Sequence, residues 1–286
     1  MMKVNRRSGI FMAIFTTCLL ILLSACGQGS SSDKQASQSN WDKIKAKGKI
    51  VVATSGTLVG SSYHDEKTDK LTGYEVEVDR ELAKRLGLKI EFKEMGVDAV
   101  MPSIQNGKID LSTASITDER KKKFDFSDPF KYSYGVAIVR AKDHSGIEKL
   151  EDLKGKKAGG AATTTYSQVA RKFGAEVKTY GNATNDVYLK DVSLGRTDVI
   201  LNDYYLCKMG LAAYPDLGLV IHPDIKFNLS EDAFITKKGS DELNEKINKA
   251  LKEMKDDGTL KKLGEQFFGA DVSKKPKEKV REVPLD

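Results

Sequence analysis

Residues 105–115, QNGKIDLSTAS, show the pattern of a helix end, a glycine turn and a buried strand. Residues 193–203, SLGRTDVILND, repeat it, since a glycine and a basic residue precede an aspartate and an apolar run. Glycine commonly ends helices, so one such match is weak by itself. The repeat nevertheless predicts two matching α/β halves, each with a sheet whose strand ends can form a ligand crevice.

Helix and strand signals also precede the first copy of this pattern. KIVVAT at 49–54 and KIEFKEM at 89–95 are short β-branched runs that favour buried strands. Between them Val78, Leu82 and Leu86 recur at four-residue spacing before a glycine, which is typical of an amphipathic helix. A strand, a helix and a strand in this order predict a parallel pair with a right-handed crossover.

The second half of the chain continues the alternation. KKAGGA at 156–161 predicts a small-residue strand, and TTTYSQVARKFG at 163–174 predicts a helix that begins at its threonines. Apolar residues at helical spacing predict two helices in the last third: Leu243, Ile247, Leu251 and Met254, then Leu260, Leu263, Phe267 and Phe268. The charged, lysine-rich tail at 273–286 is expected to fray.

The N-terminus predicts export. Three basic residues among the first seven precede an apolar run at 10–23, which is too short for a comfortable membrane span. We therefore expect a signal peptide at 1–25. The letters LSAC, which end at Cys26, resemble the lipobox of bacterial lipoproteins, and this implies that Cys26 becomes a lipidated mature N-terminus. The alternative is an ordinary apolar cysteine in an ordinary signal peptide.

Composition limits the classes of partner. Residues 26–40 have no aliphatic side chain larger than alanine and are expected to form a flexible tether. The whole chain has 47 Lys plus Arg and 41 Asp plus Glu. Three of the basic residues lie in the signal peptide, so the mature excess is 44 minus 41, or +3. This excess is too small to indicate nucleic acid binding.

Cysteine and histidine give no pattern for a metal or a nucleophile. Cys207 is the one free thiol expected in the mature chain, so no internal disulfide is possible. His64, His144 and His222 stand far apart in the sequence, without a second histidine or a cysteine at ligand spacing. We expect a protein without a cofactor.

Several stretches of the chain carry a family resemblance. They are LTGYEVEVDRELAKRLGL at 71–88, TDERKKKFDFSDPF at 117–130, GRTDVILNDYY at 195–205 and GSDELNEKINKALKEMKDDGTLKKLGEQFFG at 239–269. Over residues 41–272 the chain resembles the extracellular solute-binding proteins (family 3) of polar amino acid ABC transporters. The resemblance implies an α/β, periplasmic-binding-protein-like fold of type II, with two lobes and two hinge crossovers.

The resemblance also implies where the lobes lie. Lobe 1 would comprise residues 41–130 and 233–272, and lobe 2 residues 135–229. The crossovers would fall at 130–134 and 229–233. Short paired hinges allow rigid closure of two lobes around a ligand.

The family pattern assigns ligand-binding roles to particular residues. Arg120 would fork onto the ligand's α-carboxylate, for which a guanidinium is well suited. Thr164 and Thr165, at a helix N-terminus, would grip the same carboxylate. Asp203 and Ser115 would take the ammonium group. The alternatives are a surface ion pair for Arg120, a helix cap for one threonine, and a turn for Asp203.

The chain also departs from the family pattern. Relatives usually place aromatic residues near Leu58, Val59 and Val97, around the ligand side chain, where this chain is aliphatic. The loop before Thr117 is two residues shorter than in relatives. Tyr63 is expected in the site as a replacement. Other tyrosines could serve in the same way or belong to the core: Tyr166, Tyr204 and Tyr205.

Within the family, the chain is most similar to the L-cystine-binding lipoproteins of Gram-positive bacteria, through KYSYGVAIVR at 131–140 and GAATTTYSQVARKFGA at 160–175. This implies a monomeric binding protein on the extracellular face of the cytoplasmic membrane, which delivers cystine or a related sulfur amino acid to a permease and its ATPase. Glutamine or arginine is the alternative ligand. An extracytoplasmic enzyme on the same fold, such as a dehydratase, is a further alternative, but the sequence offers no dedicated catalytic residue.

Overall fold

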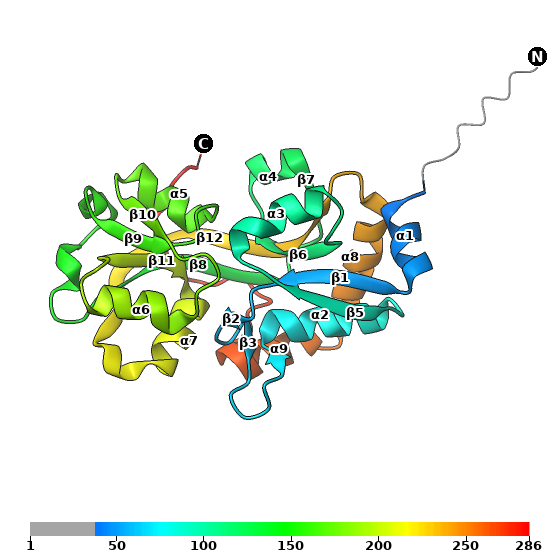
Figure 1. Cartoon of the computed structure of the whole chain (residues 1–286), viewed down its shortest axis with the longest axis horizontal. Coiled ribbons are helices and arrows are strands. Elements are labelled where there is room, and N and C mark those ends of the chain that lie inside the picture. The colour runs from blue at the N-terminus through cyan, green and yellow to red at the C-terminus, as the bar shows by residue number, and fades with distance from the viewer. Residues whose placement is uncertain (1–37, 286) are drawn as a thin grey trace, which may run out of the picture. The chain divides into compact units, whose positions relative to one another are not determined.

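The computed structural model describes residues 38–285 (Figure 1). The predictions of a signal peptide at 1–25 and of lipidation at Cys26 lie outside the described residues, as does most of the tether. None of the helices in the described part combines the length and the apolar surface that a membrane span needs.

Nine strands of the described chain form one sheet, in the order β10-β9-β11-β8-β12-β6-β1-β5, with β7 also paired to β12. Their bounds are β1 Lys49–Thr54, β5 Lys89–Glu94, β6 Leu111–Ser115, β7 Phe124–Phe126, β8 Lys131–Arg140, β9 Lys157–Gly160, β10 Glu176–Thr179, β11 Val199–Asp203 and β12 Leu219–Lys237. A small second sheet comprises β2 Thr57–Leu58, β3 Ser62–His64 and β4 Leu71–Thr72.

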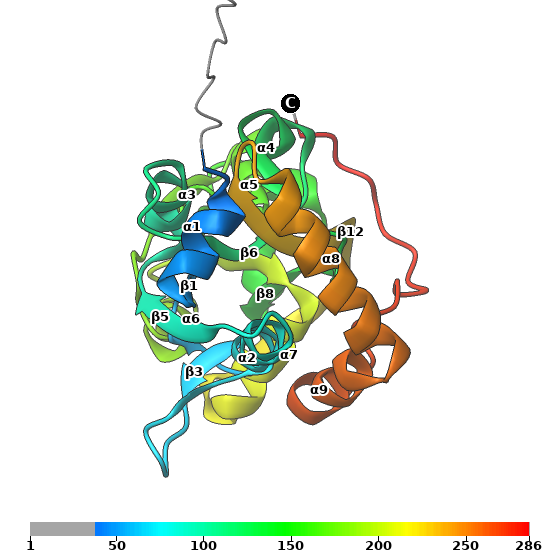
Figure 2. The same ribbon diagram turned by 90° about the vertical axis from the view of Figure 1, so that its right-hand side faces the viewer.

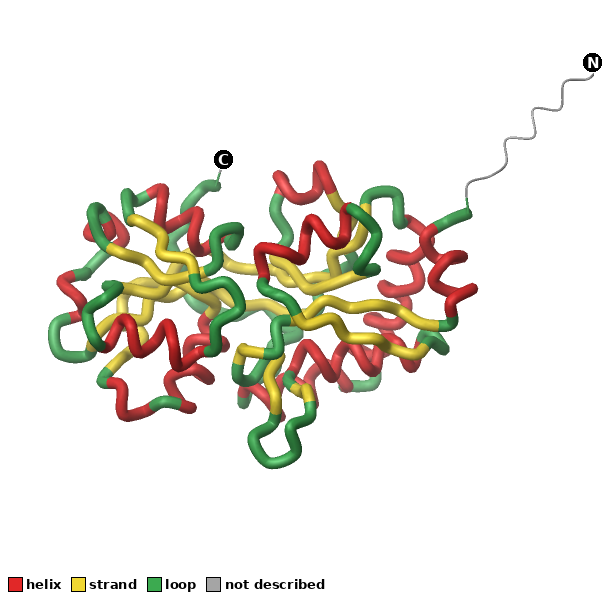
Figure 3. The backbone as a smooth tube through the Cα atoms, viewed as in Figure 1, coloured by secondary structure: helices red, strands yellow, loops and turns green. Residues whose placement is uncertain are grey.

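Helices flank the strands (Figure 3). They are α1 Asn40–Lys47, α2 Tyr74–Arg85, α3 Val97–Gln105, α4 Asp118–Lys123, α5 Thr165–Lys172, α6 Asn185–Ser193, α7 Tyr204–Ala213, α8 Asp241–Asp256 and α9 Thr259–Phe268, with short 3-10 turns η1 His144–Gly146, η2 Leu150–Leu153 and η3 Pro215–Leu217. α1 lies beside α8 (Figure 2), where Asn40 donates a hydrogen bond to the Ser240 hydroxyl (2.7 Å).

The structure confirms the strand and helix pattern of the first half. KIVVAT forms β1, which pairs in parallel with β5 so that Ile50 lies opposite Ile90. α2 buries Val78 and Leu82 and ends before Gly87, whose φ of +69° is the left-handed conformation that glycine adopts without strain. The two apolar helices predicted near the C-terminus are α8 and α9.

The repeated glycine–aspartate pattern has a structural cause. Asp110 follows α3 and accepts a hydrogen bond from the Val51 backbone N–H (2.8 Å), which ties β6 to β1. Asp198 follows α6 and accepts one from the Lys157 N–H (2.8 Å), which ties the start of β11 to β9. Each aspartate therefore fixes the neighbouring parallel strand at the same point of an α/β unit. The prediction of two matching halves is confirmed.

β8 and β12 join the two halves. They pair antiparallel from Lys131 opposite Asp232 to Arg140 opposite Leu219. The later part of β12 also pairs with β6 and β7. Two of the buried apolar clusters in the described chain draw on residues 41–130 and 234–272, and two others on residues 134–227 and Val283. The result is a two-lobed α/β fold in which the two shared strands pass from one lobe to the other (Figure 1).

The expectation of a frayed tail from Ser273 is wrong. Val283 is only 5% exposed and packs in the second lobe, and the Asn228 amide donates a hydrogen bond to its carbonyl oxygen (2.8 Å). Arg281 forms an ion pair with Glu151 (2.6 Å). The tail is rich in lysine, but its apolar residue Val283 packs against residues that are distant in the sequence. The composition of the tail alone therefore gave the wrong expectation.

Candidate ligand-binding cleft

A cavity of about 230 Å³ lies between the two lobes. Its lining includes seven of the eight residues expected in the site: Leu58, Val97, Ser115, Arg120, Thr164, Thr165 and Asp203. Tyr63 does not line the cavity. The preceding residue, Ser62, is buried and its hydroxyl accepts a hydrogen bond from the Gly56 N–H (3.0 Å). None of the residues of β3 lines the cavity, so Tyr63 lies outside it together with its neighbours in the strand. Its expected place in the site is wrong.

Arg120 reaches from lobe 1 toward lobe 2. Thr117 caps α4 by accepting a hydrogen bond from the Arg120 backbone N–H (3.2 Å), which sets the guanidinium at the cleft. Nη1 donates to the Ser115 carbonyl oxygen (2.8 Å) and Nη2 to the Thr163 carbonyl oxygen (3.0 Å). Burial lowers the pKa of Arg120, but a guanidinium stays charged at neutral pH. Glu119 pairs instead with Lys123 (3.4 Å), so the surface-pair alternative for Arg120 is not seen.

Asp203 ends β11 at the other side of the cavity and is 2% exposed. One carboxylate oxygen caps α7 by accepting a hydrogen bond from the Leu206 N–H (3.0 Å). The other oxygen accepts one from the Lys131 ammonium (3.0 Å). Asp203 can therefore cap α7 with one carboxylate oxygen while the other oxygen faces Lys131 in the cavity lining.

Lys131 and Asp232 also line the cavity, and sequence reasoning missed both. The Lys131 ammonium donates to Asp232 (2.7 Å) as well as to Asp203, and the Ser115 hydroxyl donates to Asp232 (2.7 Å). Burial acts to lower the pKa of Lys131, but the charges of Asp203, Asp232 and Glu75 act against it, and that pKa lies well above its ordinary value. The ammonium is therefore charged although the side chain is only 2% exposed.

The loop before α5 already holds a carboxylate. Asp98, in the first turn of α3, accepts hydrogen bonds from the Ala162 N–H (3.0 Å), the Thr163 N–H (2.9 Å) and the Thr163 hydroxyl (2.7 Å). Burial acts to raise the pKa of Asp98, and these hydrogen bonds bring it below its ordinary value. Thr164 caps α5 through the Ser167 N–H (3.1 Å). The loop therefore binds an anion, as predicted, but the anion seen here is the Asp98 carboxylate of lobe 1.

Further contacts close the mouth of the cleft. The Val59 N–H donates to the Asn185 side chain (2.9 Å), and the Asn182 amide donates to the Ser55 carbonyl oxygen (3.1 Å). Together with the Asp98 contacts, these bonds connect lobe 1 to lobe 2. The structure therefore represents a form in which the lobes touch.

Aromatic surface enters the cavity from lobe 2. Of the tyrosines considered from the sequence, Tyr166 lines the cavity, whereas Tyr204 stacks on Tyr134 (ring centroids 4.9 Å apart) in the core. Tyr205 packs against the first-lobe core. Tyr180 and Tyr188 line the cavity as well, together with Met95 and Met101 from lobe 1. Sequence reasoning missed these four, because they become neighbours only when the lobes meet.

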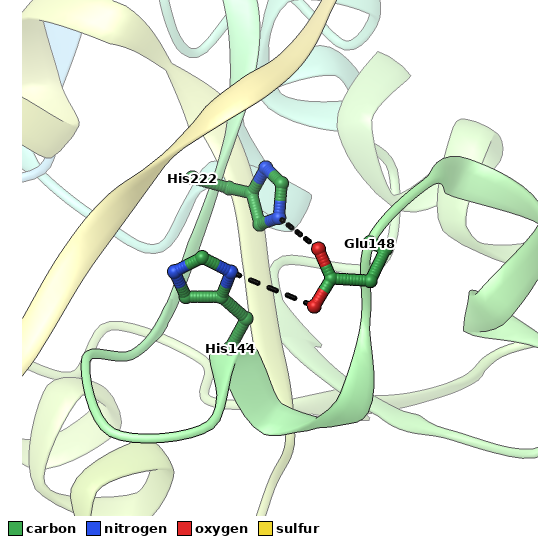
Figure 4. A group of neighbouring side chains, drawn as sticks. All are labelled: His144, Glu148 and His222. Atoms are coloured by element: carbon green, nitrogen blue, oxygen red, sulfur yellow. Dashed lines mark ion pairs between the residues drawn. The ribbon is translucent and has the colours of Figure 1, made fainter.

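A group of three titratable side chains lies apart from the cavity, in lobe 2 (Figure 4). His144 and His222 both face Glu148, at 3.7 Å each, although 78 positions separate the histidines in the sequence. The Asp224 N–H donates to Nδ1 of His222 (3.2 Å), which places the proton of the neutral ring on Nε2, toward Glu148. A metal ion would need the Nε2 lone pair, so this arrangement favours a histidine–carboxylate contact over a metal site.

The chain matches the sequence profile of a known family over residues 50–270, and that family is described as bacterial extracellular solute-binding proteins, family 3. The chain belongs to this family. Its members are binding proteins rather than enzymes, so the catalytic alternative is set aside.

Individual relatives agree with the family match. The probable ABC transporter extracellular-binding protein YckB of Bacillus subtilis is 55% identical over 276 residues, covering 95% of this chain and 96% of the relative. The L-cystine-binding protein TcyA of the same organism is 37% identical, covering 92% and 98%. The crystal structure of the substrate-binding protein AbpA of Streptococcus pneumoniae, bound to L-arginine, has a TM-score of 0.72 at 30% identity, covering 82% and 100%.

Proposed function

We propose that this protein is the substrate-binding lipoprotein of an amino acid ABC importer, and that it captures L-cystine or a related sulfur amino acid. One observation carries the proposal. The lining of one cavity includes a guanidinium bonded to neutral carbonyl oxygens, and two carboxylates that share the Lys131 ammonium. A zwitterion needs partners for both of its charges when it leaves water, and these groups are complementary to it.

The proposed binding mode follows from the contacts. The α-carboxylate takes the place of the Ser115 and Thr163 carbonyl oxygens on Arg120, in a bidentate pair. The N–H groups at the start of α5, next to Thr165, face the same carboxylate. The ammonium group lies between Asp203 and Asp232. The ligand is thereby bonded to both lobes at once.

The ligand side chain would occupy the more apolar part of the cavity. Its lining residues there are Leu58, Met95, Val97, Met101, Tyr180 and Tyr188. Methionine sulfur and aromatic faces interact well with a soft sulfur atom, which favours cystine. The name of TcyA supports the same ligand, whereas the arginine of AbpA supports the alternative of another polar amino acid, glutamine or arginine.

Closure of the lobes converts binding into a signal for the importer. We propose lobe 1 at 41–130 and 233–272, lobe 2 at 135–229, and the hinge at 130–134 and 229–233, where β8 and β12 pair residue by residue. Because the ligand contacts both lobes, it stabilises the closed form by its differential affinity. The permease and its ATPase partner would then recognise that form.

Calorimetry with L-cystine, L-cysteine, L-glutamine and L-arginine tests the ligand. We expect L-cystine to bind most tightly to the wild type and Arg120→Ala to abolish the heat of binding, while Lys121→Ala, which changes the exposed neighbour, keeps it. Failure of all four amino acids to bind the wild type would overturn the proposed function. Tighter binding of glutamine or arginine would replace cystine and keep the class.

The lipid anchor is a separate part of the proposal and rests on the LSAC letters at 23–26. In a bacterial host, labelled palmitate should be incorporated into the wild type, which should fractionate with membranes. Cys26→Ser should incorporate none and be released. Equal fractionation of the two proteins, without label in either, would reject lipidation at Cys26.

A further inference from the structure

Asn185 is a buried polar side chain that contacts both lobes. It lies in the first turn of α6 and is only 3% exposed. Its amide oxygen accepts a hydrogen bond from the Val59 N–H of lobe 1 (2.9 Å), and its amide nitrogen donates to the Tyr188 hydroxyl of lobe 2. Tyr188 lines the cavity, whereas Asn185 lies outside the lining. A buried amide needs partners at both of its ends, and here each lobe supplies one.

The partner in lobe 1 belongs to a tight turn between β2 and β3. The Ser61 N–H closes this turn by donating to the Leu58 carbonyl oxygen (3.1 Å). The Tyr74 N–H, at the start of α2, donates to the Gly60 carbonyl oxygen (2.9 Å) and ties the turn to that helix. Val59 therefore presents its N–H from a part of lobe 1 that is held at both ends.

The amide is also enclosed on the lobe 2 side. Gly210 of α7 lies so close to it that a Cβ atom at this position would be 3.1 Å from the Asn185 amide nitrogen. The glycine leaves room for the amide, and the close packing leaves the amide little freedom to turn away. The orientation of Asn185 therefore sets the place of the Tyr188 hydroxyl.

A second tyrosine of the cavity lining is held differently. Tyr180 and Tyr188 have ring centroids 6.1 Å apart. The Tyr180 hydroxyl donates to Asp191 (2.7 Å), which belongs to the same lobe. Tyr188 is instead linked through Asn185 to Val59 of the other lobe. Opening of the lobes would leave the bond of Tyr180 intact and separate Val59 from Asn185. The place of Tyr188 should therefore depend on closure, whereas the place of Tyr180 should not.

We propose that Asn185 is a positioning residue that couples lobe closure to the aromatic wall of the cavity. In the closed form, the Val59 N–H fixes the Asn185 amide, and the amide holds Tyr188 against the ligand side chain. Opening removes the first of these bonds and releases the second. Asn185 thus acts on the ligand through Tyr188, and it slows release of the ligand from the closed form. This inference rests on the proposed function and adds how the bound ligand is retained.

The rates of binding and release test the inference. Surface plasmon resonance would measure kon and koff for L-cystine, L-glutamine and L-arginine. Asn185→Leu keeps a similar volume and removes both hydrogen bonds, so koff should rise about tenfold, as the loss of one hydrogen bond from the closed form implies. kon should change less than threefold, because the ligand meets the open form first. Val187→Ala, an exposed residue of α6 outside the cavity lining, is the matched control and should leave both rates unchanged.

A double-mutant cycle tests the link to Tyr188. Tyr188→Phe removes only the hydroxyl and should raise koff about threefold. Combined with Asn185→Leu, it should leave koff within about twofold of the Asn185→Leu value, because both changes break the same link. Tyr180→Phe combined with Asn185→Leu should instead multiply the two separate effects on koff. If Asn185→Leu does not fold, Asn185→Ala takes its place in both cycles.

The outcomes separate the two proposals. If the wild type binds an amino acid and koff of Asn185→Leu stays at the wild-type value, the inference is overturned and the proposed function stands. A lower free energy of unfolding with an unchanged koff would be this outcome too, and would leave Asn185 a purely structural role. If Tyr188→Phe multiplies the effect of Asn185→Leu, the two residues act independently and the coupling is overturned. If none of the three amino acids binds the wild type, the proposed function fails and the inference fails with it.

Discussion

Arg120 from lobe 1 and Asp203 from lobe 2 hold their charges differently. The guanidinium of Arg120 donates hydrogen bonds to the carbonyl oxygens of Ser115 and Thr163 and forms no ion pair within the described part of the chain. Asp203 and Asp232, in contrast, already share the ammonium of Lys131. The guanidinium can therefore gain much from an anion, whereas the aspartates are stabilised before any ligand arrives. We expect the two groups to contribute unequally to ligand affinity.

The largest effect is expected at Arg120. Arg120→Ala removes the cation of the cavity lining that forms no ion pair with another described residue, and it should cost about 2 to 5 kcal/mol of ligand affinity, since the ligand carboxylate would be desolvated without its partner. Calorimetry against Lys121→Ala, which alters an exposed lysine of the same helix, provides the measurement and its control. A loss of affinity smaller than that of Asp203→Asn would contradict the larger role of Arg120.

A smaller loss of ligand affinity is expected at Asp203. Asp203→Asn keeps the volume and the cap of α7 but removes one negative charge, and Asp232 remains to receive the ammonium group. The affinity should fall by about 1 to 3 kcal/mol. The same titration on Ala212→Ser, an exposed residue of α7 outside the cavity lining, controls for a local change in the helix that Asp203 caps. An unchanged affinity for Asp203→Asn would remove Asp203 from the site.

The contact between Asp98 and the loop before α5 should stabilise the closed form of the two lobes. Hydrogen bonds in the closed form lower the pKa of Asp98, so the contact is fully present above the ordinary carboxyl pKa and is lost as pH falls through the depressed value. Asp98→Asn should weaken ligand binding by about 1 kcal/mol at pH 7, because the open form gains population. Small-angle scattering of the ligand-free variant should show a larger radius of gyration than the wild type, and identical curves would contradict the role.

The smallest effect on binding is expected at Thr164. Its hydroxyl caps α5, so Thr164→Ala should lower the free energy of unfolding by about 1 kcal/mol and change the ligand affinity less than threefold. Urea unfolding and calorimetry on the same sample measure the two quantities. A large loss of affinity with unchanged stability would assign the hydroxyl to the ligand instead of the helix.

Much of the fold could be predicted from local patterns. β1, α2 and α5 follow from periodicity and helix ends, and the repeat around Asp110 and Asp198 reflects one hydrogen bond made in each lobe. The packing of the tail through Val283 could not be predicted, because its partners lie in another part of the chain. Local sequence patterns determine single helices and strands. The packing of the polar C-terminal tail depends instead on residues that are distant in the sequence.

The residues of the cleft also fall into those that the sequence predicted and those that it did not. Arg120 and Asp203 follow from motifs that resemble a family, and the structure brings both to one cavity. Lys131 escaped notice because a lysine at the start of a strand is usually solvated, and its burial depends on the pairing of β8 with β12. Tyr63 was misplaced because the whole of β3 lies outside the cavity lining, which its closeness in the sequence to Leu58 does not reveal.

A crystal structure of the protein grown with L-cystine would show the proposed binding mode itself. We expect an α-carboxylate oxygen within about 3.2 Å of the Arg120 guanidinium, in place of the two carbonyl oxygens, and an ammonium group within the same distance of Asp203 or Asp232. A ligand bound elsewhere, or in this cavity with Arg120 still bonded to Ser115 and Thr163, would contradict it.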